Sequence, residues 1–232
     1  MGQLATGSPV DTLLKGGLET DCLTTVYGPA GAGKTNFALL AAIQAARAGK
    51  QVLYIDTEGG YSVERLKQLA HDYQHVLERI LFFRPTTFSE QVALFPKLQK
   101  LANVKIGLIV IDSISMLYRL ELHDDPRKIN QALGKQLAVL TAIARQKDIP
   151  ILVTNQVYSI FDEREKVQMV GGDLLKYGSK CILELQIVPG NKRRAILKKH
   201  RSQAPEQEIL FKIVEKGFEE TKESKGFYLF KK

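Results

Sequence analysis

Residues 28–35 read GPAGAGKT, which places much backbone freedom directly before a lysine and a hydroxyl side chain. The β-branched and aromatic run at residues 22–27 comes just before it and is typical of a buried strand. Residues 36–43 follow with helical composition, and this helix is expected to end near Gly49. The octet is therefore predicted to connect a strand to the N-terminus of a helix.

Glycines at 28, 31 and 33 allow backbone angles that a Cβ atom would forbid. Successive N–H groups can then point at one anion, where the helix dipole also favours negative charge. The spacing G-x-x-x-x-G-K-T is the P-loop pattern, in which the lysine reaches the outer phosphates and the hydroxyl binds Mg²⁺. A glycine-rich turn that merely precedes a lysine is the alternative, and the flanking elements disfavour it. The predicted nucleotide-binding residues are Gly28, Pro29, Ala30, Gly31, Ala32, Gly33, Lys34, Thr35 and Asn36.

The composition is that of a globular chain, with 44% hydrophobic and 25% charged residues among 232. We expect one domain over residues 1–232. No apolar run is long enough to span a membrane, and residues 1–17 contain no apolar signal core, so a cytoplasmic protein is expected. Cys22 and Cys181 are too few for a disulfide framework and are expected to be buried.

Basic residues exceed acidic ones, with 33 Lys and Arg against 25 Asp and Glu. The net charge of +8 favours a polyanionic partner without identifying one. The excess is concentrated between residues 192 and 201, which include six basic residues and no acidic one.

Strand-like and helix-like segments alternate along the first two thirds of the chain. Further strands are expected at 52–56, 79–83, 106–111 and 149–154, and helices at 63–73, 87–101 and 127–146. Continuous apolar strands separated by helices predict a mostly parallel central sheet flanked by helices. After Gly172, strand-like segments at 181–188, 194–199, 208–214 and 226–230 predict added antiparallel strands. The predicted fold class is α/β.

Three polar side chains follow predicted strands at the edge where α/β proteins bind ligands. Asp112 ends an apolar run and is predicted to bind Mg²⁺ together with Thr35; a helix cap is the alternative. Glu58 is predicted to be the general base for water attack, with Asp56 orienting it, although both could be solvated loop acids. Gln156 is predicted to sense the γ-phosphate.

Together, residues 28–35, 56–58, 111–113 and 155–156 resemble the ATPase core of the RecA/RadA recombinase family. The lead-in at residues 6–14 and 16–20 is also similar, and the resemblance covers nearly the whole chain. Within this family, the chain most resembles the short archaeal RadA paralogues called RadB. The resemblance implies a RecA-type fold, binding of ATP, Mg²⁺ and DNA, and a role in homologous recombination or repair. It also implies Lys34, Glu58 and Gln156 as catalytic residues.

The resemblance further implies two DNA-facing loops, at about 118–130 and from 157 to about 180. Acidic residues are mixed into both loops, so a solvated surface is the alternative for each basic residue there. Single-stranded DNA is the expected ligand. The candidate DNA-binding residues are Arg119, Arg127, Lys128, Lys176 and Lys180 in and near these loops, and Lys192, Arg193 and Arg194 in the basic segment.

The chain also departs from the RadA pattern. It begins almost at the ATPase core, with a lead-in at 1–21, so the N-terminal helical DNA-binding domain and the linker that docks on a neighbour are expected to be missing. Ser62-Val63 stand where RadA has the Arg-Pro pair that contacts adenine. Lys199 and Arg201 resemble finger residues that reach into a neighbour's nucleotide, which implies a homo-oligomer. A solvated strand face or a DNA contact is the alternative.

These departures favour an accessory role. The expected function is to assist the main recombinase or other repair proteins, with weak ATP hydrolysis by the monomer. One alternative is a clock-type or signalling ATPase of the same superfamily that acts on proteins without DNA. Another is a binding module in which ATP is only a conformational ligand.

Overall fold

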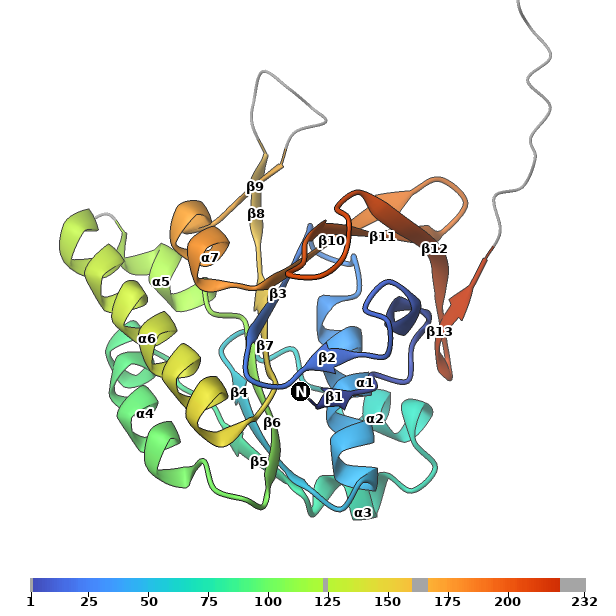
Figure 1. The fold of residues 1–232 in the computed structure, drawn as a ribbon, viewed down its shortest axis with the longest axis horizontal. Helices are drawn as coiled ribbons and strands as arrows, with labels where there is room; N and C mark the ends of the chain where they lie inside the picture. The colour runs from blue at the N-terminus through green and yellow to red at the C-terminus, as the bar shows by residue number, and fades with distance from the viewer. Residues whose placement is uncertain (1, 123–124, 160–166, 222–232) are drawn as a thin grey trace, which may run out of the picture.

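The computed structural model describes residues 2–122, 125–159 and 167–221. A nine-stranded sheet runs through the middle of the molecule, with helices on both faces (Figure 1). Helices α1–α3 cover one face, and α4–α7 cover the other (Figure 1). Two clusters of buried apolar side chains fill the space between the sheet and these two helical layers. This is the predicted layered α/β arrangement.

The central strands are parallel, and their sequence explains why. They pair in the order β3-β7-β6-β4-β5, and their side chains are almost entirely buried, as expected for a sheet covered on both faces. All neighbouring pairs within this set run parallel. Their bounds are β3 Leu23–Tyr27, β4 Gln51–Asp56, β5 Ile80–Phe83, β6 Ile106–Asp112 and β7 Ile151–Asn155.

The C-terminal third adds four strands at the β3 edge. β10 pairs parallel with β3, and β11, β12 and β13 then continue in antiparallel fashion. Their bounds are β10 Cys181–Val188, β11 Lys192–Lys199, β12 Gln207–Val214 and β13 Gly217–Glu220. The predicted antiparallel extension is therefore confirmed.

The helices are α1 Lys34–Arg47, α2 Val63–Leu69, α3 Tyr73–Leu77, α4 Phe88–Leu101, α5 Met116–Glu121, α6 Pro126–Lys147 and α7 Gly172–Gly178. Smaller elements are the pair β1 Gln3–Leu4 and β2 Leu18–Glu19, the 3₁₀ turn Pro9–Thr12, and the hairpin of β8 Val157–Ser159 and β9 Val167–Met169. No helix in the described part of the chain combines the length and apolar character that crossing a membrane requires.

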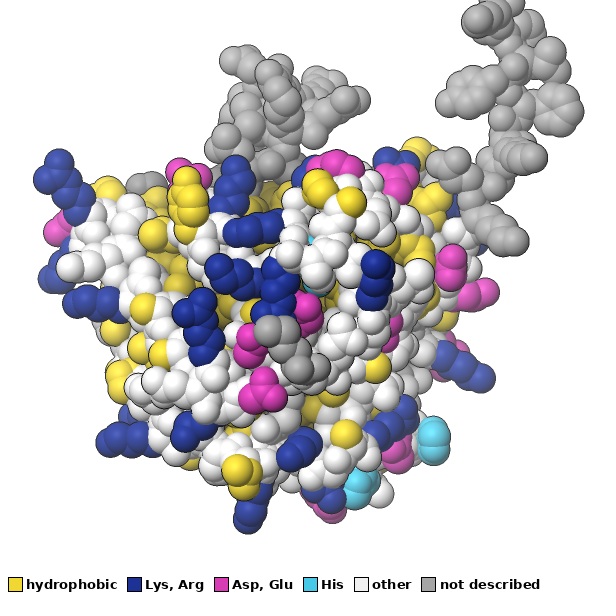
Figure 2. All heavy atoms as spheres, in the orientation of Figure 1, with side chains coloured by type: hydrophobic (Ala, Val, Ile, Leu, Met, Phe, Trp, Pro, Cys, Tyr) yellow, Lys and Arg dark blue, Asp and Glu magenta, His cyan; other side chains and the backbone are white. Residues whose placement is uncertain are grey.

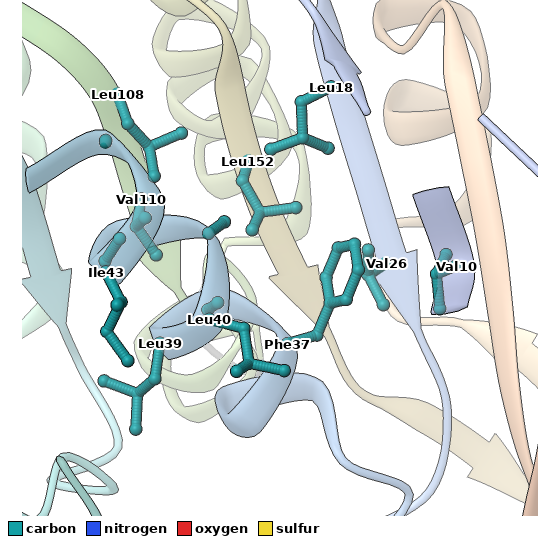
Figure 3. Close-up of a cluster of buried hydrophobic side chains, with 14 of the residues drawn as sticks. Val10, Leu18, Val26, Phe37, Leu39, Leu40, Ile43, Leu108, Val110 and Leu152 are labelled. Carbon is teal, nitrogen blue, oxygen red and sulfur yellow. The ribbon is translucent and has the colours of Figure 1, made fainter. Parts of the chain in front are cut away.

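Helix α1 packs against the sheet directly after the predicted P-loop. Its apolar side chains, including Phe37, Leu40 and Ile43, are buried among side chains of the sheet strands (Figure 3). The ring of Phe37 stacks on Phe218 of β13, with 6.4 Å between ring centroids. The C-terminal strands therefore pack against the same helix as the parallel sheet.

Three predictions about local structure were wrong. Residues 63–73 form two short helices, because Ala70 adopts an extended conformation and ends α2. Residues 118–130 do not form one loop. They hold the end of α5 and the start of α6, where the Asp125 side chain accepts a hydrogen bond from the Lys128 amide at 3.2 Å. Part of the loop predicted from 157 to 180 is the helix α7. The strand predicted at 226–230 lies outside the described residues.

Candidate nucleotide site

The predicted P-loop lies between β3 and α1, as the sequence indicated. Gly33 is the N-cap of α1 and has a φ of 105°, which lies in the left-handed region. At Gly28, an added Cβ atom would lie 2.2 Å from the carbonyl oxygen of Leu185 on β10. Backbone angle and close packing therefore both demand glycine in this turn. The first N–H groups of α1 have no helical acceptor and are available to phosphate oxygens.

Lys34 folds back onto the loop. Its Nζ atom donates hydrogen bonds to the carbonyl oxygens of Gly28 at 2.8 Å and Pro29 at 2.9 Å. The side chain is buried, and burial lowers its pKa below the ordinary lysine value. A negatively charged phosphate is a stronger partner than a carbonyl oxygen for such a buried ammonium group. The lysine is thus positioned for an anion that enters the loop.

Asp112 lies at the end of β6, in the core of the candidate site. Only 2% of the residue is exposed. Oδ2 accepts a hydrogen bond from Tyr54 at 2.9 Å, and Oδ1 accepts one from Thr154 at 2.5 Å. Burial raises the pKa of the carboxyl, while hydrogen bonds from Thr154, Thr35 and Tyr54 work in the opposite direction.

The Thr35 hydroxyl and the Asp112 carboxylate therefore lie within hydrogen-bonding reach of each other. Mg²⁺ prefers a small number of protein oxygen ligands and completes its shell with phosphate oxygens and water. The pair fits that requirement chemically. Its role as the metal site stays a prediction.

Glu58 and Gln156 meet at the carboxyl edge of the sheet. Oε1 of Glu58 accepts a hydrogen bond from Nε2 of Gln156 at 2.9 Å and another from the Ser113 hydroxyl at 2.5 Å. Ser113 follows a cis peptide bond with Asp112. Sequence reasoning did not assign Ser113 a role, although its position beside Asp112 was the available signal. The predicted base thus lies beside the predicted sensor, and the hydroxyl fixes its orientation.

Asp56 shapes the loop that carries Glu58. Its Oδ1 accepts a hydrogen bond from the Gly60 amide, and its Oδ2 accepts one from the Tyr61 amide, each at 3.2 Å. The carboxylate closes a turn around Glu58. It therefore holds the loop in place without a direct hydrogen bond to Glu58.

Two arginines form hydrogen bonds with residues of the predicted nucleotide-binding segment. The sequence analysis did not predict a place for either of them in this site. Arg65 donates from Nε to Asn36 Oδ1 at 2.6 Å and also bonds the carbonyl oxygens of Val214 and Glu215, which ties α1 and α2 to β12. Burial lowers the pKa of Arg65. Arg193 donates from Nε to the carbonyl oxygen of Gly31 at 2.9 Å, and its predicted role in DNA binding stays a prediction. These contacts connect β11 and β12 with the P-loop and the first turn of α1. No local sequence pattern reveals them, because the partners lie far apart in the chain.

The predicted finger residues are already engaged within this chain. Lys199 Nζ donates a 2.6 Å hydrogen bond to the carbonyl oxygen of Lys176. Arg201 forms ion pairs with Glu19 at 2.8 Å and with Asp21 at 2.9 Å, and both acids raise its pKa further. Reaching a neighbour's nucleotide requires these contacts to break, and the finger role stays a prediction.

The other candidate DNA-binding residues are spread over several elements. Arg119 lies on α5, Arg127 and Lys128 on α6, Lys176 on α7, Lys180 just before β10, and Lys192 and Arg194 on β11. Arg194 lies 3.7 Å from Glu208 on the neighbouring strand β12. The structure does not bring this set together as one site.

Comparisons with known proteins agree on one family. A family model described as Rad51 matches residues 1–221. The chain is 41% identical over 222 residues to the DNA repair and recombination protein RadB of Methanobrevibacter smithii, covering 93% of this chain and 94% of that protein. It is 42% identical over 214 residues to the RadB protein of Methanocaldococcus jannaschii, covering 89% of this chain and 97% of that one.

A solved structure points the same way. The crystal structure of the RadB recombinase superposes with a TM-score of 0.81 at 37% identity, over 95% of this chain and 100% of that one. The fold, the P-loop and the shared sequence thus lead to one result, which also confirms the resemblance inferred from the sequence. The chain belongs to the Rad51 family of recombinases, and within it is similar to the RadB proteins.

Proposed function

We propose that this chain is an ATP- and DNA-binding protein of homologous recombination and DNA repair, which assists the main recombinase and hydrolyses ATP weakly on its own. The observation that carries the ATPase part is the junction of Glu58, Gln156 and Ser113 at the sheet edge that carries the P-loop. Members of the Rad51 family to which the chain belongs are ATPases. The relatives' names, which refer to DNA repair and recombination, support the DNA part.

The proposed mechanism begins with the triphosphate on the backbone N–H groups of residues 30–35. Lys34 leaves the carbonyl oxygens of Gly28 and Pro29 and pairs with the outer phosphates. Thr35 and Asp112 would hold Mg²⁺, which neutralises charge on the phosphate oxygens when bound. Glu58 then accepts a proton from the attacking water.

Gln156 supplies the link to the rest of the molecule. Its amide nitrogen contacts Glu58, and its backbone carbonyl accepts a 3.1 Å hydrogen bond from Val170, just before α7. A shift of this side chain toward a γ-phosphate would release Glu58 and displace the segment leading into α7. We propose that ATP occupancy is passed to DNA-binding residues along this route.

Slow hydrolysis by the isolated molecule follows from the finger residues. The ion pairs of Arg201 with Glu19 and Asp21 keep its charge away from any nucleotide until a partner molecule is bound. The partners we propose are single-stranded DNA, the main recombinase or other repair proteins, and a second copy of the chain. We also propose that residues 1–232 act as one domain and that the protein works in the cytoplasm.

The test is an ATPase assay with and without single-stranded DNA, run over a range of protein concentrations. We expect low basal turnover, stimulation by DNA, and specific activity that rises with concentration. Binding to an oligonucleotide should weaken steeply with salt, since lysine and arginine contacts release counterions. An absence of DNA binding at low salt would refute the DNA part and favour an ATPase that acts on protein partners. Efficient strand exchange by this protein alone would refute the accessory role.

A further inference from the structure

Residues 113–115 connect β6 to α5 and carry two hydroxyl groups that contact the proposed base and the proposed sensor. The Ser113 hydroxyl donates to Oε1 of Glu58 at 2.5 Å, and the Ser115 hydroxyl accepts a hydrogen bond from the backbone N–H of Gln156 at 3.3 Å. Both serines are almost completely buried. The orientation of Glu58 and of Gln156 therefore depends on the position of this segment.

The sheet end supports the segment through backbone contacts. The N–H of Ile114 donates to the carbonyl oxygen of Thr154 at 3.2 Å. The Thr57 hydroxyl donates to the carbonyl oxygen of Ser113 at 2.6 Å and accepts a hydrogen bond from the Ser113 N–H at 3.0 Å. These bonds tie residues 113–115 to the same chain segments that carry Glu58 and Gln156.

The layer of α4 and α6 supports the segment as well. The side-chain amide of Gln91, on α4, donates one hydrogen bond to the carbonyl oxygen of Ile114 at 3.3 Å and a second to Oε1 of Gln136, on α6, at 2.8 Å. Lys and Arg side chains stand on the outer surface of this layer (Figure 2), whereas Gln91 is 0% and Gln136 2% exposed. These two glutamines, here called the amide pair, therefore join the interior of the helical layer to Ile114.

Stability alone does not account for the amide pair. Among the residues that the structure describes, Oε1 of Gln91 and Nε2 of Gln136 are buried without a hydrogen-bond partner. A buried polar atom without a partner destabilises a fold, whereas two apolar side chains in the same place carry no such cost. The side chains one helical turn away belong to the apolar core: Phe88, Phe95, Leu133 and Leu140. The hydrogen bond to Ile114 gives the pair a role that apolar side chains could not fill.

We propose that Gln91 and Gln136 are positioning residues for ATP hydrolysis, which hold the carbonyl group of Ile114 so that Ser113 keeps Glu58 in place. The inference rests on the proposed function and deepens it, because it makes the packing of α4 against α6 a place from which turnover is controlled. A displacement of about 1 Å at a reacting group can lower a rate by about 10²-fold. Neither glutamine belongs to the P-loop, so the effect should fall on turnover and not on ATP binding.

The test replaces both amides together. Methionine is unbranched like glutamine and cannot donate these hydrogen bonds. Because the two unpaired atoms disappear with the pair, Gln91→Met/Gln136→Met should unfold at nearly the wild-type concentration of urea. We expect its kcat for ATP to fall by about 2- to 100-fold, with KM near the wild-type value. The matched control is Gln99→Met/Gln131→Met, which makes the same changes at exposed positions of the same helices and should keep wild-type turnover.

A double-mutant cycle measures whether the amide pair acts through Glu58. In the Glu58→Gln background, assayed with radiolabelled ATP, loss of the pair should lower kcat by a clearly smaller factor, since the group that it positions is already gone. A general weakening of the fold would lower kcat by the same factor in both backgrounds. Hydrogen exchange gives a readout without ATP: the amides of residues 113–118 should exchange faster in the amide-pair variant than in the wild type and the control.

The outcomes separate this inference from the function on which it rests. If Glu58→Gln lowers turnover and the amide-pair variant does not, the inference is overturned and the proposed function stands. If the wild type hydrolyses no ATP, the ATPase part of the proposed function is refuted, while faster exchange would still support the hold of the pair on residues 113–115. Unchanged exchange in the amide-pair variant, or equal factors in the two backgrounds of the cycle, would also overturn the inference.

Discussion

The side-chain amide of Gln156 donates a 2.9 Å hydrogen bond to Oε1 of Glu58, a residue 98 positions earlier in the chain. Glu58 follows β4 and Gln156 follows β7, and β6 with Asp112 lies between these strands in the sheet. Parallel strands place their carboxyl ends at one edge, so three separate loops converge there. The proposed base is therefore oriented by a residue that would also contact the γ-phosphate.

Replacing the proposed base tests this arrangement first. Glu58→Gln should lower kcat for ATP by about 10²- to 10⁴-fold, which is the usual range for loss of a general base. ATP affinity should stay near the wild-type value, because Glu58 does not belong to the P-loop. The control is Glu64→Gln, an exposed acid on α2 that pairs with Lys67 at 2.8 Å. Equal turnover by Glu58→Gln and the wild type would exclude Glu58 as the base.

The hydrogen bond between Arg193 and Gly31 of the P-loop leads to a second prediction. Arg193→Ala removes the 2.9 Å hydrogen bond to the carbonyl oxygen of Gly31. ATP affinity measured by calorimetry should weaken by about 2- to 13-fold, which corresponds to one net hydrogen bond of about 0.5–1.5 kcal/mol. Arg194→Ala is the matched control, since that side chain faces Glu208. A loss of DNA affinity with unchanged ATP affinity would instead support the role predicted from the sequence.

The packing of Phe37 in the core next to the P-loop can be tested by measuring the free energy of unfolding. Phe37 is buried between the sheet and Phe218, so Phe37→Ala leaves a large cavity (Figure 3). We expect the free energy of unfolding in urea to fall by about 3–5 kcal/mol, and by less for Phe37→Leu. Val104→Ala, at a residue that is 88% exposed, should change it by less than about 0.5 kcal/mol. A loss below about 1 kcal/mol at Phe37 would contradict this packing.

The two cysteines give a pH-dependent prediction. Burial raises the pKa of Cys22 to about 12, with the charge of Glu19 adding to the rise, and burial also raises the pKa of Cys181. At pH 8 the folded protein should therefore react very slowly with a thiol reagent, since the thiolate is the nucleophile. Urea should release two reactive thiols. Rapid labelling of the folded protein would contradict the burial of these thiols.

The raised pKa of Cys22 also predicts that the folded state loses stability as the pH rises. The folded pKa of Cys22 lies above the ordinary value of 9.0, so the folded state holds its proton more tightly than the unfolded chain. This contribution is fully present below about pH 9 and is lost as pH rises toward about 12. Cys22→Ser should weaken that alkaline loss of stability, measured as unfolding temperature against pH.

The parallel sheet and the glycine-rich turn between β3 and α1 were predictable because local sequence patterns mark both. Continuous apolar runs mark strands that are buried on both faces, and the glycine spacing marks the turn. The sequence also placed Asp112, Glu58 and Gln156 at strand ends, which was enough to expect them at one edge.

Other features depend on contacts that no local pattern records. The roles of Ser113 and Arg65 arise from partners on other loops and strands, as does the contact of Arg193 with Gly31. The start of α6 is a different case, because Asp125-Pro126 is a local helix-start signal. The helix predicted at 127–146 is accordingly confirmed as α6, Pro126–Lys147, whereas the loop expected at 118–130 from the resemblance was wrong.

At the centre of the proposed function, a triphosphate lies on the backbone N–H groups of residues 30–35, with its metal between Thr35 and Asp112. A crystal structure with Mg²⁺ and a non-hydrolysable ATP analogue tests it most directly. We expect phosphate density within the loop, Lys34 moved from Gly28 and Pro29 to the phosphates, and Mg²⁺ beside Thr35. Phosphate density at another place, with Lys34 still bonded to those two carbonyl oxygens, would contradict it.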